Sequence, residues 1–136
     1  MTGVLRVLLW IYGIILIVVG LGCIISPDWM AEIFYGVENL PNGGLFFVVM
    51  LGSVFVPIGV WLAAAGRDPV KFITWVKFVI LKIGIWIVVE VFTLIKGYIE
   101  PDAMVITLLV VDFIFGLAFL VFYPWRTARE SKQGEL

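Results

Sequence analysis

The residues with the greatest chemical potential in this sequence stand inside its most apolar stretches. Lys82, Trp86 and Glu90 are spaced four apart, so on a helix they form one stripe. Asp112 lies within a separate apolar run, VITLLVVDFIF. A charge at the centre of a bilayer costs about 2.5–3.5 kcal/mol on insertion scales. We therefore expect these groups to face inward, with Lys82 paired to Asp112 and Glu90 either protonated or bonded to a polar partner.

A proline in a neighbouring apolar stretch adds polar capacity. Pro57 has no amide proton and displaces the carbonyl four residues earlier, which predicts a helix kink and frees the carbonyl of Ser53 as an acceptor for Lys82. Gly59 and Ala63 form a small-xxx-small pair that favours close helix packing. The predicted intramembrane polar network comprises Ser53, Lys82, Trp86, Glu90 and Asp112.

Three interpretations of these charges remain open. They can fix the register or assembly of helices, as buried polar groups sometimes do. They can form a ligand or proton site, because ionisable residues within membranes commonly mark substrate and ion routes. Alternatively, the long side chains reach the membrane interface while their stems lie in lipid.

The composition of the chain indicates that the segments carrying these residues lie in lipid. The chain has 136 residues, of which 63% are hydrophobic and 14% charged, whereas soluble domains have about 45–50% and about 25%. Four apolar segments, 4–25, 44–65, 69–96 and 102–123, each reach the length of about 20 residues that crosses a bilayer. The sequence predicts an all-α, four-transmembrane-helix bundle as one domain over 1–125, with a polar tail over 126–136.

The connection between the first two segments has a helical pattern of its own. Ser26 suits a helix cap, Pro27 a first helical position and Gly36 a helix terminator. Apolar side chains recur at helical spacing between them: Trp29, Met30, Ile33 and Phe34. We predict a short amphipathic interfacial helix over 27–36, which either lies flat on the membrane surface or plugs the mouth of the bundle.

Basic residues predict the orientation. Seven of the nine lysines and arginines fall on one side of the predicted bundle: Arg6, Arg67, Lys71, Lys77, Arg126, Arg129 and Lys132. Since cytoplasmic loops carry the excess of basic residues, both termini are expected to be cytoplasmic, in a bacterial inner membrane.

Missing residue types exclude several classes of site. The chain has no histidine, so it cannot by itself supply histidine ligands to haem, chlorophyll or zinc, or a Ser-His-Asp triad. No metal site is expected, and Cys23 is expected to be a buried thiol. A net charge of −1 offers no basic field for nucleic acid. The 6 tryptophans and 11 phenylalanines are typical of packing and interface anchors, with a pigment or quinone pocket as the alternative.

Several short motifs together resemble a known family. The run SPDWMAEIFYG, the glycine-bearing LGSVFVPIG, the GRDP turn and VDFIFG resemble the BphX-like small membrane proteins and, more distantly, the DoxX-like group. The resemblance implies a four-helix membrane bundle and brings no catalytic residue with it. Lys82 and Glu90 depart from the family pattern.

The leading functional prediction is a non-enzymatic accessory subunit that binds and stabilises a larger membrane complex. Its partners would be the lipid bilayer and other membrane subunits or further copies of the chain. One alternative is a small carrier or proton-linked channel that uses the intramembrane charges. A second is a pigment- or quinone-binding membrane subunit.

Overall fold

The computed structural model describes residues 2–125, and all regular structure in this range is helical. The helices are α1 (Thr2–Ile25), α2 (Pro27–Tyr35), α3 (Asn42–Ala65), α4 (Ile73–Ile95) and α5 (Ala103–Val121). All except α2 are long and apolar enough to cross a membrane. The prediction of four long apolar helices with a short helix between the first two is confirmed. The polar tail over 126–136 lies outside the described residues.

Local chemistry sets the helix ends. Ser26 precedes α2 and Gly36 ends it in the left-handed region, at φ 63°, as the sequence predicts. The third long helix begins later than position 69, because the Asp68 carboxylate accepts a hydrogen bond from the Lys71 amide at 3.1 Å and closes a turn. The Asp102 side chain caps α5 by accepting from the Val105 amide at 2.8 Å.

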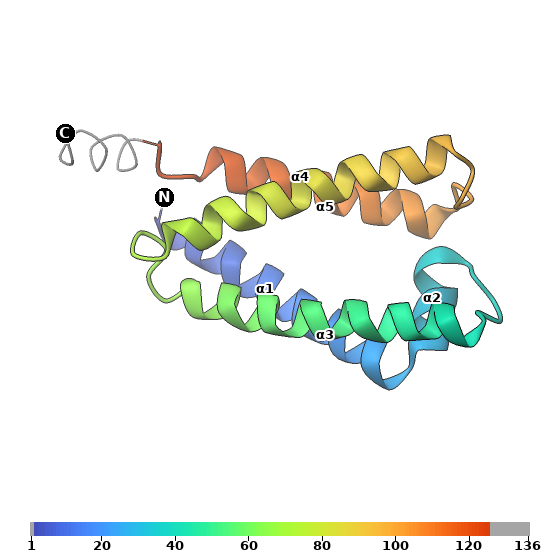
Figure 1. The fold of residues 1–136 in the computed structure, drawn as a ribbon. Coiled ribbons are helices and arrows are strands. Elements are labelled where there is room, and N and C mark those ends of the chain that lie inside the picture. Colours follow the sequence, from blue (N-terminus) through green and yellow to red (C-terminus); the bar gives the residue numbers. More distant parts are fainter. Residues whose placement is uncertain (1, 126–136) are drawn as a thin grey trace.

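The long helices form two antiparallel pairs, α1 with α3 and α4 with α5 (Figure 1). The pairs approach each other at the end where α1 begins and spread apart toward the other end, where α2 lies. We call these the closed end and the α2 end. Because α2 packs against α1, α3 and α5, it joins the two pairs where they are furthest apart.

Opposed glycines bring α1 and α3 close together. A Cβ atom on Gly59 would lie 2.5 Å from the Gly13 carbonyl oxygen, and one on Gly52 would lie 2.5 Å from the Gly20 carbonyl oxygen. No larger residue fits at such separations without moving the backbone. This close approach of small residues is the usual way in which membrane helices gain packing contacts.

The apolar core fills the closed end. Its fully buried side chains come from all four long helices: Leu5, Leu9, Leu62, Val76, Val79 and Phe119. Trp61 of α3 and Trp75 of α4 stack with ring centroids 5.6 Å apart and planes 3° from parallel, which adds an aromatic contact between the pairs. At most 33% of the apolar window of any long helix is buried within the protein, so the remaining surface needs lipid.

Candidate functional site

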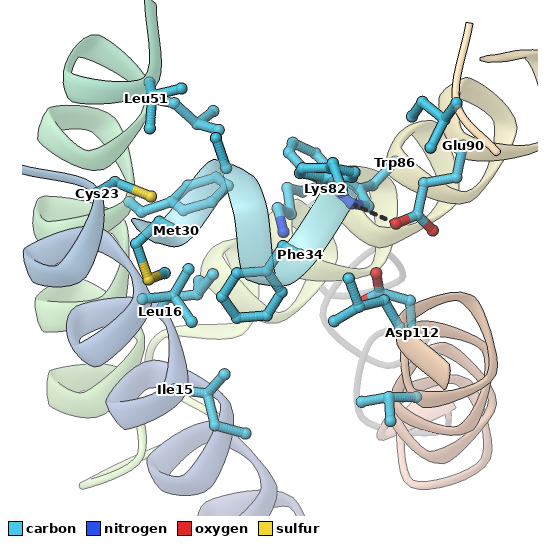
Figure 2. Close-up of a pocket in the computed structure, with 18 of the residues that line it drawn as sticks. Ile15, Leu16, Cys23, Met30, Phe34, Leu51, Lys82, Trp86, Glu90 and Asp112 are labelled. Atoms are coloured by element: carbon cyan, nitrogen blue, oxygen red, sulfur yellow. Dashed lines mark hydrogen bonds between the residues drawn. The ribbon is translucent and has the colours of Figure 1, made fainter. Parts of the chain in front are cut away.

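A cavity of about 380 Å³ lies between the two helix pairs at the α2 end. Its walls come from the middle of each long helix and the part of it nearer the α2 end, together with one side of α2 (Figure 2). Most lining side chains are apolar, including Leu16, Leu51 and Phe34. Lys82, Glu90 and Asp112 bring charge to the same space. The cavity therefore combines an apolar surface with three ionisable groups.

Lys82 lies among aromatic rings. Its Nζ donates a hydrogen bond to the Tyr12 hydroxyl of α1 at 2.9 Å. The same nitrogen lies 4.8 Å from the ring centroid of Trp86, 5.2 Å from that of Phe55 and 5.3 Å from that of Tyr12. Ring faces at these distances attract a cation, more strongly where water is excluded. The ammonium is thus stabilised by one hydroxyl and three rings, supplied by α1, α3 and α4.

Glu90 is the most deeply buried of the three charged residues at the cavity. The residue is only 6% exposed. Its Oε1 accepts a hydrogen bond from the indole Nε1 of Trp86 at 3.2 Å, along the dashed line of Figure 2. Its Oε2 is buried without a hydrogen-bond partner in the described part of the chain. Trp86 therefore serves both groups, with its ring near Lys82 and its N–H bonded to Glu90.

Asp112 lines the cavity from α5 and is partly buried. Across residues 2–125, no lysine or arginine nitrogen lies within 4.0 Å of a carboxylate oxygen. The expected ion pair between Lys82 and Asp112 is therefore not formed. The reason is geometric, because Lys82 extends across the cavity to the Tyr12 hydroxyl of the other helix pair.

The predicted polar network is only partly assembled. Lys82, Trp86, Glu90 and Asp112 line one cavity, whereas Ser53 does not. Ser53 is exposed on α3, and its hydroxyl donates to the Met50 carbonyl oxygen at 2.7 Å. Including Ser53 in the network was wrong, because its position on the helix turns it toward lipid.

The structure tests one part of the predicted role of Pro57, the acceptor for Lys82, and the helix kink stays a prediction. α3 runs unbroken through Pro57, from Asn42 to Ala65 (Figure 1). Lys82 donates to the hydroxyl of Tyr12 and not to the carbonyl of Ser53, four residues before the proline. The slim face predicted on this helix is present, because a Cβ on Gly13 of α1 would lie 3.3 Å from the Cβ of Ala63.

The short helix α2 closes the wide end of the cavity. Met30, Ala31, Phe34 and Tyr35 line the cavity, while Trp29, at 59% exposed, points away from the core. The sequence left open whether this helix lies flat on the membrane surface or plugs the mouth of the bundle, and its contacts with the cavity fit the plug. The remaining residue of the predicted apolar face, Ile33, is partly buried but does not line the cavity.

Tyr35 adds a hydroxyl to the cavity from α2. Burial, followed by the nearby charges of Glu90 and Asp112, raises the pKa of Tyr35 to about 12. A phenol with this pKa remains protonated at neutral pH, so Tyr35 is a hydrogen-bond donor there.

Sequence reasoning missed three members of the site, Tyr12, Phe55 and Tyr35. Tyr12 had a signal, since it is the only hydroxyl in the apolar run WIYGIILIVVG and lies within reach of the opposing helix pair. Phe55 had none, because it is one of 11 phenylalanines and only the packing of α3 on α4 sets its ring 5.4 Å from that of Trp86.

The described residues offer no group of three or more Cys, Asp or Glu side chains that could hold a metal ion. Comparisons with protein-family models, with curated proteins and with solved structures found no match to this chain. The resemblance to BphX-like proteins therefore remains a prediction, and function is inferred from the geometry of the cavity.

Proposed function

We propose that the chain is a non-enzymatic membrane protein that binds a lipophilic small molecule in the cavity at the α2 end. The observation that carries this proposal is Glu90, which has a buried carboxylate oxygen without a hydrogen-bond partner on the wall of an apolar cavity. Buried polar groups are nearly always bonded, and leaving one unbonded costs about 1–3 kcal/mol. A ligand that carries a donor would remove this cost.

The size and lining of the cavity fit such a role. Pockets for small molecules measure about 300–1,000 Å³ and combine apolar walls with a few polar groups. This cavity, at about 380 Å³, lies within that range. A quinone or pigment, considered from the aromatic content of the sequence, belongs to the same broad class of lipophilic ligand.

The closed end favours binding over conduction. Leu9, Leu62 and Phe119 are fully buried there, and together with the rest of the core they separate the cavity from that end of the bundle. A channel or carrier that uses Lys82, Glu90 and Asp112 would need this core to open. Binding needs no such rearrangement, so it is the simpler proposal.

The accessory-subunit hypothesis also remains a prediction. The exposed apolar faces of the long helices are equally suited to lipid and to another membrane protein, so they do not favour a partner. Placement in a bacterial inner membrane with cytoplasmic termini is likewise a proposal, supported by the distribution of basic residues.

Two neighbouring valines of α5 allow a test with a matched control. Val111 lines the cavity, whereas Val110 does not and is 51% exposed. We expect the wild-type protein and Val110→Phe, gently extracted from membranes, to retain one lipophilic molecule per chain in native mass spectrometry. Val111→Phe should lose it, because the larger ring fills the space. Retention in Val111→Phe equal to that in Val110→Phe, or no retained molecule in wild type, would contradict the proposal.

A further inference from the structure

We propose that the ligand of this cavity is a lipophilic amine in its protonated form, with its ammonium group bound at Glu90. This inference rests on the proposed binding function and specifies the chemical class of the ligand. It follows from which charged groups of the cavity already have partners and which do not.

The cation of the cavity already has one hydrogen-bond partner and nearby aromatic rings. Lys82 has the Tyr12 hydroxyl at 2.9 Å and three aromatic rings within 5.3 Å of its Nζ. An anionic ligand would have to enter this aromatic enclosure or draw Lys82 out of it. An anion at Lys82 would therefore compete with these partners, whereas a cation at Glu90 would meet a buried oxygen that has none in the described residues.

The acids of the cavity are not satisfied. Glu90 has an unpartnered oxygen although the residue is only 6% exposed. Asp112 lines the same cavity, and no cationic nitrogen in residues 2–125 lies within ion-pair distance of its carboxylate. Two carboxylates against one lysine leave an excess of acceptors, which one cationic donor would offset. A protonated amine can also give Glu90 a charge-assisted hydrogen bond, the stronger kind.

Position separates the ligand cation from Lys82. Glu90 follows Lys82 by two helical turns on α4, which is about 12 Å along the axis at 1.5 Å per residue. Lys82 lies toward the closed end, and Glu90 lies toward α2. The rings of Phe34 and Tyr35, which line the cavity from α2, would add aromatic surface around the cation. The hydrocarbon part of the ligand would occupy the apolar walls.

Three probes of equal chain length test this assignment: decylammonium, decanoate and decanol. We expect the purified chain in a non-ionic detergent to bind decylammonium most tightly by isothermal titration calorimetry. Glu90→Gln should weaken this binding by about tenfold or more, as the loss of about 1.4 kcal/mol would do. Glu32→Gln, which neutralises an exposed acid of α2, should bind decylammonium as the wild type does.

A second measurement uses the wild-type chain, so it does not depend on the folding of a variant. Dicyclohexylcarbodiimide modifies carboxyl groups in apolar surroundings, and mass spectrometry of peptides locates the modification. We expect decylammonium to abolish the N-acylurea adduct at Glu90, either by blocking the reagent or by trapping the activated carboxyl as its decylamide with loss of the urea. Decanol at the same concentration, which does not consume the reagent as a carboxylate would, should leave the adduct in place.

Several results would overturn the assignment. Tighter binding of decanoate, lost in Lys82→Gln, would show that the cavity selects an anion and would leave the proposed binding function intact. Decanol binding as tight as that of decylammonium would show that the positive charge of the ligand does not contribute to binding. Equal decylammonium binding by wild type and Glu90→Gln would exclude Glu90. If no probe binds, the assignment of an amine ligand is wrong. The proposed binding function is then still tested separately, by the retention of a molecule in native mass spectrometry.

Discussion

Tyr12 is the residue that couples the two helix pairs at the inner end of the cavity. Its hydroxyl accepts the Lys82 hydrogen bond from α4, and its ring lies 5.1 Å from that of Phe115 and 5.8 Å from that of Phe119 on α5. A single side chain of α1 thus contacts both helices of the other pair. The hydroxyl also replaces the carboxylate that a buried lysine would otherwise require.

We predict that Tyr12→Phe will destabilise the protein while leaving the ring contacts in place. Hydrogen bonds to charged groups contribute about 1.5–3 kcal/mol, so the free energy of unfolding should fall by a similar amount. Detergent-induced unfolding in mixed micelles, followed by circular dichroism, measures this change. Tyr98→Phe is the control, because Tyr98 is 72% exposed. Equal losses in the two variants would mean that the Tyr12 hydroxyl contributes nothing specific.

At the scale of elements, α1 and α3 pack backbone against backbone. At two contacts, Gly13 with Gly59 and Gly20 with Gly52, the backbones are so close that only glycine fits. By contrast, a Cβ on Gly116 of α5 would meet only side-chain atoms of α4, the nearest at 3.2 Å. The backbones of α1 and α3 therefore cannot separate or slide without losing contact, whereas α4 and α5 meet through side chains that can adjust.

We predict that adding one methyl group will have opposite effects on the two halves. Gly59→Ala places a Cβ 2.5 Å from a backbone oxygen, and overpacking of this kind costs about 1–3 kcal/mol. Gly84→Ala on α4 meets no atom within 4 Å and should be neutral or stabilise the helix by about 0.5–1 kcal/mol. The thermal midpoints of the two variants, compared with wild type in one detergent, test the difference. A thermal midpoint of Gly59→Ala at or above that of Gly84→Ala would contradict the close contact between α1 and α3.

At the scale of the whole molecule, charge is distributed unequally between the two ends. The turn between α3 and α4 at the closed end carries Arg67 and Lys71 with one acid, Asp68, while the connection from α2 to α3 carries Glu38 and no lysine or arginine. Basic loops stay on the cytoplasmic side. The α2 end of the cavity is therefore proposed to face away from the cytoplasm.

We predict this orientation to be measurable with single cysteines in a Cys23→Ser background. Asn39→Cys, on the exposed connection after α2, should react with a membrane-impermeant thiol reagent in intact cells. Lys71→Cys, on the exposed turn after α3, should react only after the membrane is permeabilised. The reverse pattern would invert the proposed orientation without changing the fold.

The sequence predicts the helices well because hydrocarbon imposes a length and a composition on every spanning segment. It also predicts the ends of α2, since Pro27 and Gly36 act locally, although the Ser26 side chain makes no cap hydrogen bond. The partner of Lys82 could not be predicted in the same way. Depth along each helix suggested Asp112, but the choice of Tyr12 depends on how the two helix pairs are placed relative to each other, which depth along a single helix does not give. Ser53 was misassigned because depth does not give the direction of a side chain.

The blind inner wall of the cavity limits the ways in which a bound molecule can travel. A compound that enters beside α2 meets packed leucine, valine and phenylalanine side chains before it reaches the opposite leaflet. It must then depart by the side from which it arrived. On the proposed binding function, the chain would therefore take up and release its ligand on the same side of the membrane.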